Sequence, residues 1–407
     1  MVDTVVKSIG TTSRDYSTIT AWAAALPSNF TTSRSSTCGS GSTSSTIVLD
    51  ASASGSNDFY KAHTVVWNGQ TRLITAYTGA TKTATIGAYN GGSATWSGGP
   101  PASGDAYSIN AVIWQGECYN DSTFTDDNVT ISGHTTSSAA YPVLTTGSGQ
   151  SFVDNANKLT NALKYNASNG VSWSKNFSYS LAMTCGDSYF QMSNLQIKDT
   201  GGTNAGLLNF SASSNCVIQN CIFEQPTRNG YQILKLYAGV TRNCLFVYTG
   251  SGASSSLIYL QGGAAMSCCT VVQPSDLSTA RAYLTSVYNT AGDVIDSAFF
   301  GMSNTFFGTF GSGSGYNCTD LSSAPGSNNQ TSKTYSSQFQ GVTSSAQDYR
   351  LKTGADCLDT GTTDTTNNPS AIDIVGTTRP QGSAWDIGAW ELVVAAARAF
   401  FIRQGVG

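Results

Sequence analysis

Five short segments in the middle of the chain share one pattern of polar and apolar positions. Each has a polar or small residue, then a small or apolar one, and a large apolar residue two positions further on. The polar positions are Asn194, Asn220, Asn243, Cys268 and Asp296, and the large apolar ones are Ile197, Phe223, Phe246, Val271 and Phe299. The middle positions (195, 221, 244, 269 and 297) are 26, 23, 25 and 28 residues apart. Units at such intervals predict a solenoid, whose turns bury their apolar faces by stacking.

The residue types in these units favour a parallel β-helix over a leucine-rich repeat. They combine alternating β-branched and aromatic residues with returns rich in Gly, Ser and Thr, and they lack leucines at fixed offsets. In a β-helix, Cys221 and Phe223 stack against Cys244 and Phe246 of the next coil. The Asn positions then lie at turns, where the amides satisfy backbone groups and repeat as a ladder.

A short amphipathic helix is predicted at residues 18–26, with Ser17 as its N-cap and Pro27 ending it. Its apolar residues recur at i, i+3, i+4 and i+7, namely Ile19, Trp22, Ala23 and Leu26. Because a solenoid has an open end that would pair with other sheets, we expect this helix to cover the first coil.

The pattern of alternating stretches and turn residues between residues 33 and 112 predicts a small inserted β subdomain. Alternating stretches at 71–77 and 82–88 flank a turn at 78–81 and indicate a hairpin, and a further strand is expected at 107–109. The predicted layout is therefore an N-terminal cap at 1–32, the insertion at 33–112, a parallel β-helix at 113–330, last coils with a closing motif at 331–391, and an apolar C-terminal tail at 392–407.

Composition adds limits on partners. Only 11% of the residues are charged, 40% are hydrophobic and the net charge is −4, which argues against a disordered chain. The pI of about 5.1 and the lack of a Lys/Arg run argue against nucleic-acid binding. Stacked coils repeat each position at ~5 Å, so like charges would repel and uncharged ladders are favoured.

The start of the chain shows no basic region followed by an apolar stretch, and no segment approaches the ~18 apolar residues that span a bilayer. We therefore expect synthesis in a cytoplasm, no membrane insertion, and reduced, buried cysteines. The ten cysteines include no C-x2-C pair and there are only two histidines, His63 and His134, so neither a metal site nor any other cofactor is predicted.

Several segments, taken in order, resemble a family of tailed-bacteriophage virion proteins. They are residues 9–22 (IGTTSRDYSTITAW), 116–120 (GECYN), 152–157 (FVDNAN) with 161–167 (NALKYNA), the Asn-Cys-x-Phe coils, and 378–391 (TRPQGSAWDIGAWE). The insertion looks like a segment that recurs in phage tail and particle proteins, and residues 386–391 also resemble the terminal coil of bacterial surface β-helix proteins. The resemblance implies a right-handed parallel β-helix and a component of the virus particle.

Because phage β-helices are often glycan-degrading tailspikes, an active site has to be considered. Glycoside hydrolysis usually needs two carboxylates about 5 to 10 Å apart, and Glu224 with Asp296 is the best pair within the coils. Asp126 and Asp127 precede a strand and indicate a turn. Five C-terminal acids leave a calcium site open, without EF-hand spacing: Asp356, Asp359, Asp364, Asp373 and Asp386. Neither histidine lies beside a Ser/Asp arrangement typical of a catalytic triad.

The apolar tail at 392–407 has only two charged residues, Arg398 and Arg403, and contains Phe400, Phe401 and Ile402. A tail of this composition is an aggregation hazard on a free monomer. It therefore either packs along its own β-helix or docks into a partner, and we favour docking through these five residues.

The sequence thus predicts an all-β chain, a right-handed parallel β-helix with a capping helix and an inserted hairpin domain. The favoured function is a non-enzymatic virion structural protein, a capsid-decorating or head-surface component. It is assembled in the host cytoplasm and contacts other virion proteins, with a homo-oligomer such as a trimer expected. The alternative is a tailspike or fibre that binds, and in one version cleaves, a host polysaccharide through aromatics at Tyr231, Tyr237, Tyr248 and Tyr259. A cellular adhesin is a weaker third interpretation, because no export signal is visible.

Overall fold

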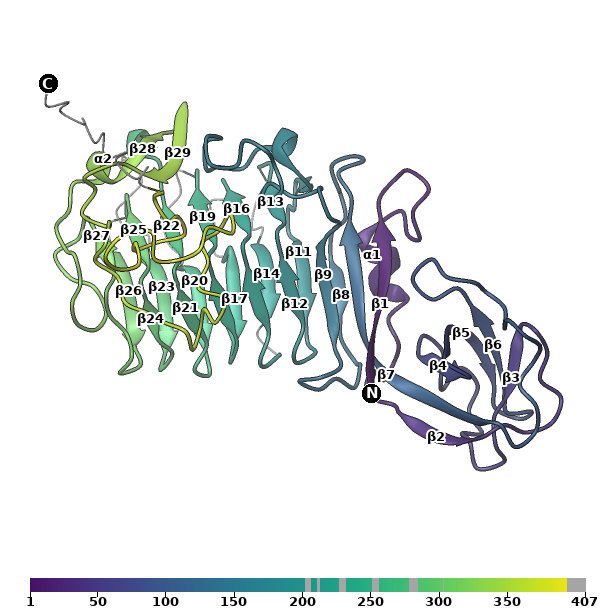
Figure 1. Ribbon diagram of the computed structural model, residues 1–407. Helices are drawn as coiled ribbons and strands as arrows, with labels where there is room; N and C mark the ends of the chain where they lie inside the picture. The colour runs from purple at the N-terminus through teal and green to yellow at the C-terminus, as the bar shows by residue number, and fades with distance from the viewer. Residues whose placement is uncertain are drawn as a thin grey trace, which may run out of the picture.

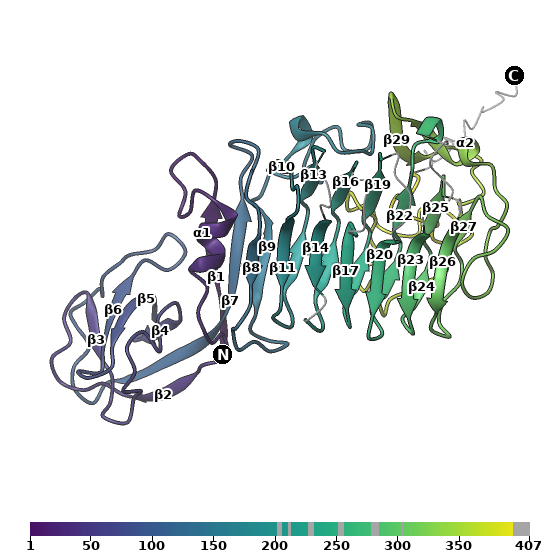
Figure 2. The same ribbon diagram turned by 180° about the vertical axis from the view of Figure 1, so that it is seen from behind.

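The protein folds as a right-handed parallel β-solenoid of about six turns with little helix, which confirms the predicted fold class. The computed structural model describes residues 1–201, 206–210, 213–226, 232–250, 256–277, 285–302 and 304–393. Figure 1 shows the coils stacked into a rod, with the inserted subdomain projecting from the N-terminal end. Figure 2 shows the same arrangement from behind.

Three parallel sheets run along the rod, each receiving strands from successive coils. The first contains β9 (Pro142–Thr146), β12 (Gln191–Ser193), β15 (Val217–Gln219), β18 (Val240–Arg242), β21 (Ala265–Ser267) and β24 (Val294–Ile295). The second contains β10 (Ser172–Lys175), β13 (Gln196–Asp199), β16 (Ile222–Gln225), β19 (Leu245–Tyr248), β22 (Thr270–Val272), β25 (Ala298–Phe300) and β27 (Cys318–Thr319). The third contains β8 (Val129–Ile131), β11 (Leu181–Cys185), β14 (Gly206–Phe210), β17 (Leu234–Tyr237), β20 (Ser256–Gln261), β23 (Thr285–Thr290) and β26 (Asn304–Thr309).

The large apolar positions of the repeat form one continuous row in the second sheet. They pair in register from coil to coil, in the order Ile197, Phe223, Phe246, Val271 and Phe299. The rings of Phe223 and Phe246 are stacked, with centroids 5.0 Å apart and planes 14° apart. All five side chains are fully buried, so the predicted stacking is confirmed.

The polar positions of the repeat all lie at a turn with a left-handed backbone. Their φ angles run from 49° at Asp296 to 65° at Asn194, and Cys268 shares the conformation at 52°. Asn and Asp adopt this region more easily than other residues with a side chain, which accounts for their repetition here. Each backbone N–H of the row donates to a carbonyl of the next coil at 3.1 to 3.3 Å. The turn placement is confirmed, and the repeated bond runs through the backbone.

The predicted cap helix is present as α1 (Ile19–Ala24). Its N-cap is Thr18, whose hydroxyl accepts a hydrogen bond from the N–H of Ala21 at 3.0 Å, so the assignment of Ser17 was wrong by one residue. Trp22 is fully buried and α1 lies against β8, β1 and β7, where it covers the first coil.

The first coil also contains a strand that the sequence pattern did not predict. β1 (Val2–Ile9) pairs in parallel with the second half of β7 (Ala106–Cys118), matching Val2 with Ala111 and Ile9 with Cys118. The same β7 pairs with β9 on the solenoid side. One strand of 13 residues therefore belongs to the inserted subdomain at its start and to the solenoid at its end.

The inserted subdomain is an antiparallel sheet with a core of its own. Its strands are β2 (Arg34–Thr37), β3 (Thr46–Val48), β4 (Thr64–Trp67), β5 (Gln70–Thr78), β6 (Thr83–Gly87) and the start of β7. β5 and β6 form the predicted hairpin. Asp3 joins this sheet to the solenoid, because its Oδ2 accepts hydrogen bonds from Thr64 Oγ1 and Asn110 Nδ2 at 2.6 and 2.9 Å.

The segment at 331–391, expected to form last coils, folds back along the rod instead. It contains α2 (Tyr335–Gln338) and the antiparallel hairpin of β28 (Phe339–Thr343) and β29 (Ala346–Leu351), and then crosses the coils that precede it. In Figure 1 the yellow end of the trace lies across the coils rather than extending their stack. We call residues 334–391 the C-terminal strap.

The strap closes a second hydrophobic core on the outside of the second sheet. Outward-facing Ile222, Leu245 and Phe300 lie in one buried cluster with Tyr349 and Trp390 of the strap. A loop that contains the 3-10 helix at 167–169 borders the same region, which also includes the buried side chains of Phe152 and Leu163. Because these apolar residues point outward from the second sheet, they would be exposed to water without the strap, which buries them.

Candidate functional site

Several aromatic side chains lie on the outer face of the third sheet. There Lys235 pairs in register with Tyr259, and Tyr237 pairs with Gln261. Tyr237 is 43% exposed and Phe307 of β26 is 63% exposed. The ammonium of Lys235 lies 5.4 Å from the centre of the Tyr259 ring, and the Tyr259 hydroxyl accepts a hydrogen bond from Gln261 Nε2 at 3.3 Å. We call these five residues the third-sheet outer face.

The four tyrosines proposed from the sequence are not all brought together. Tyr237 and Tyr259 are neighbours on the third-sheet outer face, whereas Tyr248 lies on β19 of the second sheet and is buried. Tyr231 lies outside the described residues. Phe307 was missed, although adjacent phenylalanines at 306 and 307 carry the signal, since one side chain of such a pair points outward in a strand.

The proposed acid pair of Glu224 and Asp296 is not assembled, which corrects that prediction. Glu224 projects from β16, where it forms a 2.8 Å ion pair with Lys198. Asp296 precedes β25, which lies three strand spacings away through β19 and β22. Three spacings amount to ~14 Å, beyond the separation that glycoside hydrolysis uses. The position of a residue within its repeat indicates the face on which it lies. It does not give the number of coils between two residues, and that number sets their separation.

Asp296 instead holds the strap to the row of left-handed turns formed by the polar positions of the repeat. Its Oδ1 accepts a hydrogen bond from the N–H of Thr362 at 2.8 Å, and its carbonyl accepts one from Gly388 at 2.7 Å. Its Oδ2 is buried and has no hydrogen-bond partner in the part of the chain that the structure describes. Burial raises the pKa of Asp296 to about 8, and the negative charges of Asp364 and Glu391 add to this effect.

The closing motif is organised around one buried arginine. Arg379 Nη1 lies 3.1 Å from Glu391 Oε2, and both side chains are almost fully excluded from solvent. The guanidinium also donates to the carbonyls of Asp386 and Gly388 at 2.6 and 2.7 Å. The residues that carry the resemblance at 378–391 thus act by locking the strap into a fixed loop.

The C-terminal acids are engaged separately. Asp373 accepts three backbone N–H bonds, and burial raises its pKa. Burial also raises the pKa of Asp386, to about 6. Asp356 pairs with Lys333, Asp364 accepts from Ser267, and Asp359 accepts from the N–H of Ala384. Over the described ranges, no three His, Cys, Asp or Glu side chains are grouped so as to hold a metal ion, and the calcium hypothesis gains no support.

Sequence inspection missed a histidine–carboxylate pair. His134 Nδ1 lies 2.5 Å from Asp187 Oδ2, and the His134 N–H donates to Asp187 Oδ1 at 3.1 Å. The next hydroxyl along the chain, that of Ser188, bonds Ser214 at 2.7 Å. His63 is buried between the cap and the insertion, and burial lowers its pKa. The pair of His134 and Asp187 therefore links the segment after β8 to the segment after β11. Because the hydroxyl of Ser188 bonds Ser214, the pair does not form a catalytic triad with it.

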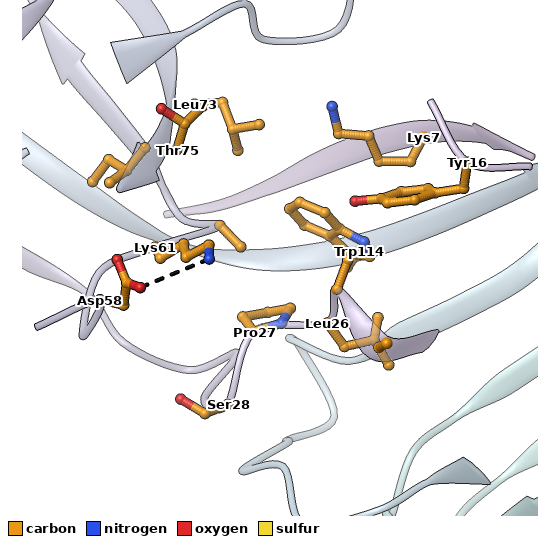
Figure 3. A pocket seen from close by; sticks show the side chains of 14 residues that line it. Lys7, Tyr16, Leu26, Pro27, Ser28, Asp58, Lys61, Leu73, Thr75 and Trp114 are labelled. Carbon is orange, nitrogen blue, oxygen red and sulfur yellow. Dashed lines mark ion pairs between the residues drawn. The ribbon is translucent and has the colours of Figure 1, made fainter. Parts of the chain in front are cut away.

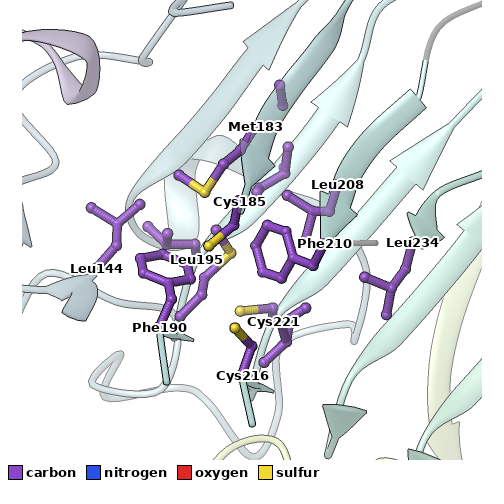
Figure 4. Close-up of a cluster of buried hydrophobic side chains, with 14 of the residues drawn as sticks. Leu144, Met183, Cys185, Phe190, Leu195, Leu208, Phe210, Cys216, Cys221 and Leu234 are labelled. Carbon is purple, nitrogen blue, oxygen red and sulfur yellow. The ribbon is translucent and has the colours of Figure 1, made fainter. Parts of the chain in front are cut away.

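All ten cysteines are buried and free, as expected from a sequence in which no export signal is visible. Figure 4 shows the sulfurs of Cys185, Cys216 and Cys221 within the apolar interior beside Phe190 and Phe210. Burial raises the pKa of Cys118 and Cys268, the latter to about 11. The cysteines thus serve as small apolar side chains of the coil interior.

The docking residues proposed in the tail, Arg398, Phe400, Phe401, Ile402 and Arg403, lie outside the described residues. Comparison of the chain with protein-family models, with curated proteins and with solved structures found no match. A search of the described helices for one long and apolar enough to cross a membrane found none.

Proposed function

We propose that this chain is a non-enzymatic structural protein of a tailed-bacteriophage particle, a β-helix that decorates the capsid or another part of the head surface. The fold agrees with this role as it does with other surface-binding solenoids. The finer assignment follows the resemblance carried by residues 9–22, 116–120 and 378–391.

The observation that carries the proposal is the second core beneath the strap. The strap contacts the rod at positions far apart along its length. At one end the N–H of Leu163 donates to Asp348 Oδ1 of the strap at 3.0 Å, and at the other the N–H of Gly388 donates to the carbonyl of Asp296. It therefore fastens coils that would otherwise contact only their neighbours. A rod braced along its length suits a component that bears load or holds a surface at a fixed distance.

The use of the buried acids supports a structural role as well. Asp373, Asp386 and Glu391 accept backbone N–H groups of the strap, and Glu391 also pairs with Arg379. Carboxylates engaged in this way stabilise a loop and are removed from water, so they are poorly placed to meet a substrate.

Imaging of intact particles tests this proposal. Antibody fragments against the inserted subdomain, bound to purified particles, should label many sites over the head in a regular lattice. Labelling confined to the tail would contradict head decoration and would favour the alternative described next. Particles that carry no label after a positive control on the purified protein would refute the virion assignment.

The alternative, a tail protein that binds a host polysaccharide, is favoured by one observation, the third-sheet outer face. Sugars stack on exposed aromatic rings, and Tyr237 and Phe307 are 43% and 63% exposed on this face. Binding of surface polysaccharide to the wild-type protein, weakened by Tyr237→Ala with Phe307→Ala and unchanged by Tyr179→Ala, would support it. Tyr179 is 77% exposed and lies in the turn before β11, which makes it a matched control. Release of oligosaccharides in the same assay would overturn the non-enzymatic assignment.

A further inference from the structure

A cleft of about 570 Å³ lies between the N-terminal cap and the inserted subdomain. One wall comes from α1 and the residues after it, and the opposite wall comes from the hairpin strand β5 with residues 58–62. Figure 3 shows Lys61 and Asp58 on one side, Lys7 and Tyr16 on the other, and Trp114 between them. Its volume falls within the range of sites that bind ligands or peptide segments.

The cleft has an apolar lining and a rim without excess charge. Its apolar lining residues include Leu26 and Pro27 on the first wall, Leu73 on the second, and Trp114 between them. Each rim lysine has a nearby carboxylate, with Lys7 Nζ 3.3 Å from Asp15 and Lys61 Nζ 3.7 Å from Asp58. A site of this kind favours an apolar segment with few charges over a strongly anionic ligand.

We infer that this cleft receives the C-terminal tail of a second copy of the chain, with Phe400, Phe401 and Ile402 against its apolar lining. The tail offers the matching chemistry, since it combines these large apolar side chains with only two arginines. Arg398 and Arg403 can meet the carboxylates of the rim, which now face the lysines. An apolar cleft and an apolar segment are each unfavourable in water, and their contact buries both.

The position of the tail favours a second copy over its own cleft. The N–H of Leu392 bonds Asp386 Oδ2 at 2.7 Å, and the N–H of Ala389 bonds Thr270 of β22, so the tail begins beside β22. From that coil to β7 there are five strand spacings, ~24 Å. Phe400 lies seven residues after Val393, and seven residues span at most ~23–25 Å when fully extended. Its own tail would therefore have to be fully extended to reach β7, and the wall formed by β5 lies beyond β7, whereas the tail of a neighbouring rod has no such limit.

A contact between the C-terminal end of one rod and the N-terminal end of the next is heterologous. Repetition of such a contact forms a ring if the rotation closes and a filament if it does not. This inference rests on the proposed structural role, because it takes the partner to be a second copy of the same chain. Its test uses purified protein, however, so a negative result here leaves the particle-labelling result unaffected.

The test compares three full-length proteins by sedimentation velocity. The cleft variant combines Ala24→Arg with Thr75→Arg, two exposed wall positions where a long cation fills the entrance without disturbing the core. The tail variant replaces Phe400, Phe401 and Ile402 by Ser. The wild-type should associate as its concentration rises, and each variant alone should sediment as the 42.5 kDa monomer. Thr78→Arg, an exposed position on β5 outside the cleft, should associate as the wild-type does.

An equimolar mixture of the cleft variant and the tail variant is the decisive sample. The first retains its tail and the second retains its cleft, so the mixture should form a dimer and no longer species. A wild-type that stays monomeric at every concentration would overturn the inference, whether the tail docks in its own cleft or elsewhere. Association that survives the cleft substitutions would overturn it as well. Circular dichroism and melting of each variant verify that loss of association does not reflect loss of folding.

Discussion

The side-chain amides of Asn243 and Asn368 donate to each other, although 125 residues separate them in the chain. Asn243 Nδ2 lies 3.3 Å from Asn368 Oδ1, and Asn368 Nδ2 lies 3.2 Å from Asn243 Oδ1. Both residues are buried, so the pair joins the turn before β19 to the strap without access to water.

Loss of this amide pair should destabilise the fold. Asn368→Ala leaves the buried amide of Asn243 without its partner, and we expect the free energy of unfolding in urea to fall by about 1 to 3 kcal/mol. Asn243→Ala should cost about 1 kcal/mol more, because alanine is also disfavoured in the left-handed turn. Thr366→Ala, at an exposed neighbouring position, should change stability by less than about 0.5 kcal/mol. Equal effects at positions 366 and 368 would show that the pair contributes nothing.

Ionisation of Asp296 should weaken the strap. Its folded pKa is raised to about 8, whereas an unfolded aspartate titrates near ~4. Between these pH values the native state holds one proton more than the unfolded chain, so stability falls as the pH rises, by up to about 1.4 kcal/mol per pH unit. Asp296→Asn should reduce this slope and be more stable than the wild-type at pH 8. Urea unfolding at pH 5, 6.5 and 8 measures both effects.

A second aspartate of the strap provides the control for that prediction. Asp373 Oδ1 accepts from the N–H groups of Val375 and Thr377, and its Oδ2 accepts from Glu391. Asp373→Asn turns one acceptor into a donor, so we expect about 1 to 3 kcal/mol of destabilisation already at pH 5. If both substitutions stabilise the protein at pH 8, the difference assigned to the unpartnered oxygen of Asp296 is wrong.

The interior row and the outer face should respond differently to the same truncation. Phe246→Ala removes a fully buried ring between two neighbouring coils, and a loss of about 3 to 5 kcal/mol is expected. Phe307→Ala removes a ring that is 63% exposed and should cost less than about 1 kcal/mol. Thermal and urea unfolding of the two variants, side by side with the wild-type, make the comparison.

The thiols should be unreactive in the native protein. All ten are buried, so the reagent cannot reach them in the folded protein. For Cys268, burial also raises the pKa to about 11, which keeps its nucleophilic thiolate scarce at neutral pH. Iodoacetamide followed by mass spectrometry should therefore label few or none of the ten before unfolding and all ten in denaturant. Rapid native labelling of Cys221 or Cys244 would contradict their place in the coil interior.

The repeated coils were predictable because their signal is periodic and local. Phe223 and Phe246 lie 23 residues apart, and a β-helix converts that interval directly into a contact. The turn position was predictable for the same reason, although its left-handed backbone explains Asn220 and Asn243 better than an amide ladder does. The α1 cap followed from a 3.6-residue period, and only the choice between Ser17 and Thr18 failed.

The strap was not predictable from such patterns. Its contacts join residues more than 100 positions apart, such as Arg242 with the carbonyl of Asn367, and no period relates them. The same limit explains the failure of the acid pair. Alternation along a strand assigns a residue to a face, but the separation between Glu224 and Asp296 depends on how many coils lie between them. The pairing of β1 with β7 was hidden because the whole insertion intervenes.

That pairing of β1 with β7 also sets an order of events during synthesis. Val2 finds its partner only in Ala111, so the first strand to leave the ribosome waits until the entire inserted sheet has followed it. The insertion has a hydrophobic core formed by its own residues, so it does not need the solenoid in order to fold during this interval. We therefore expect the completed β7 to provide the edge with which β1 and β9 pair, and the coils to be added in the order of translation. On this view, folding of the projecting subdomain precedes and nucleates the rod.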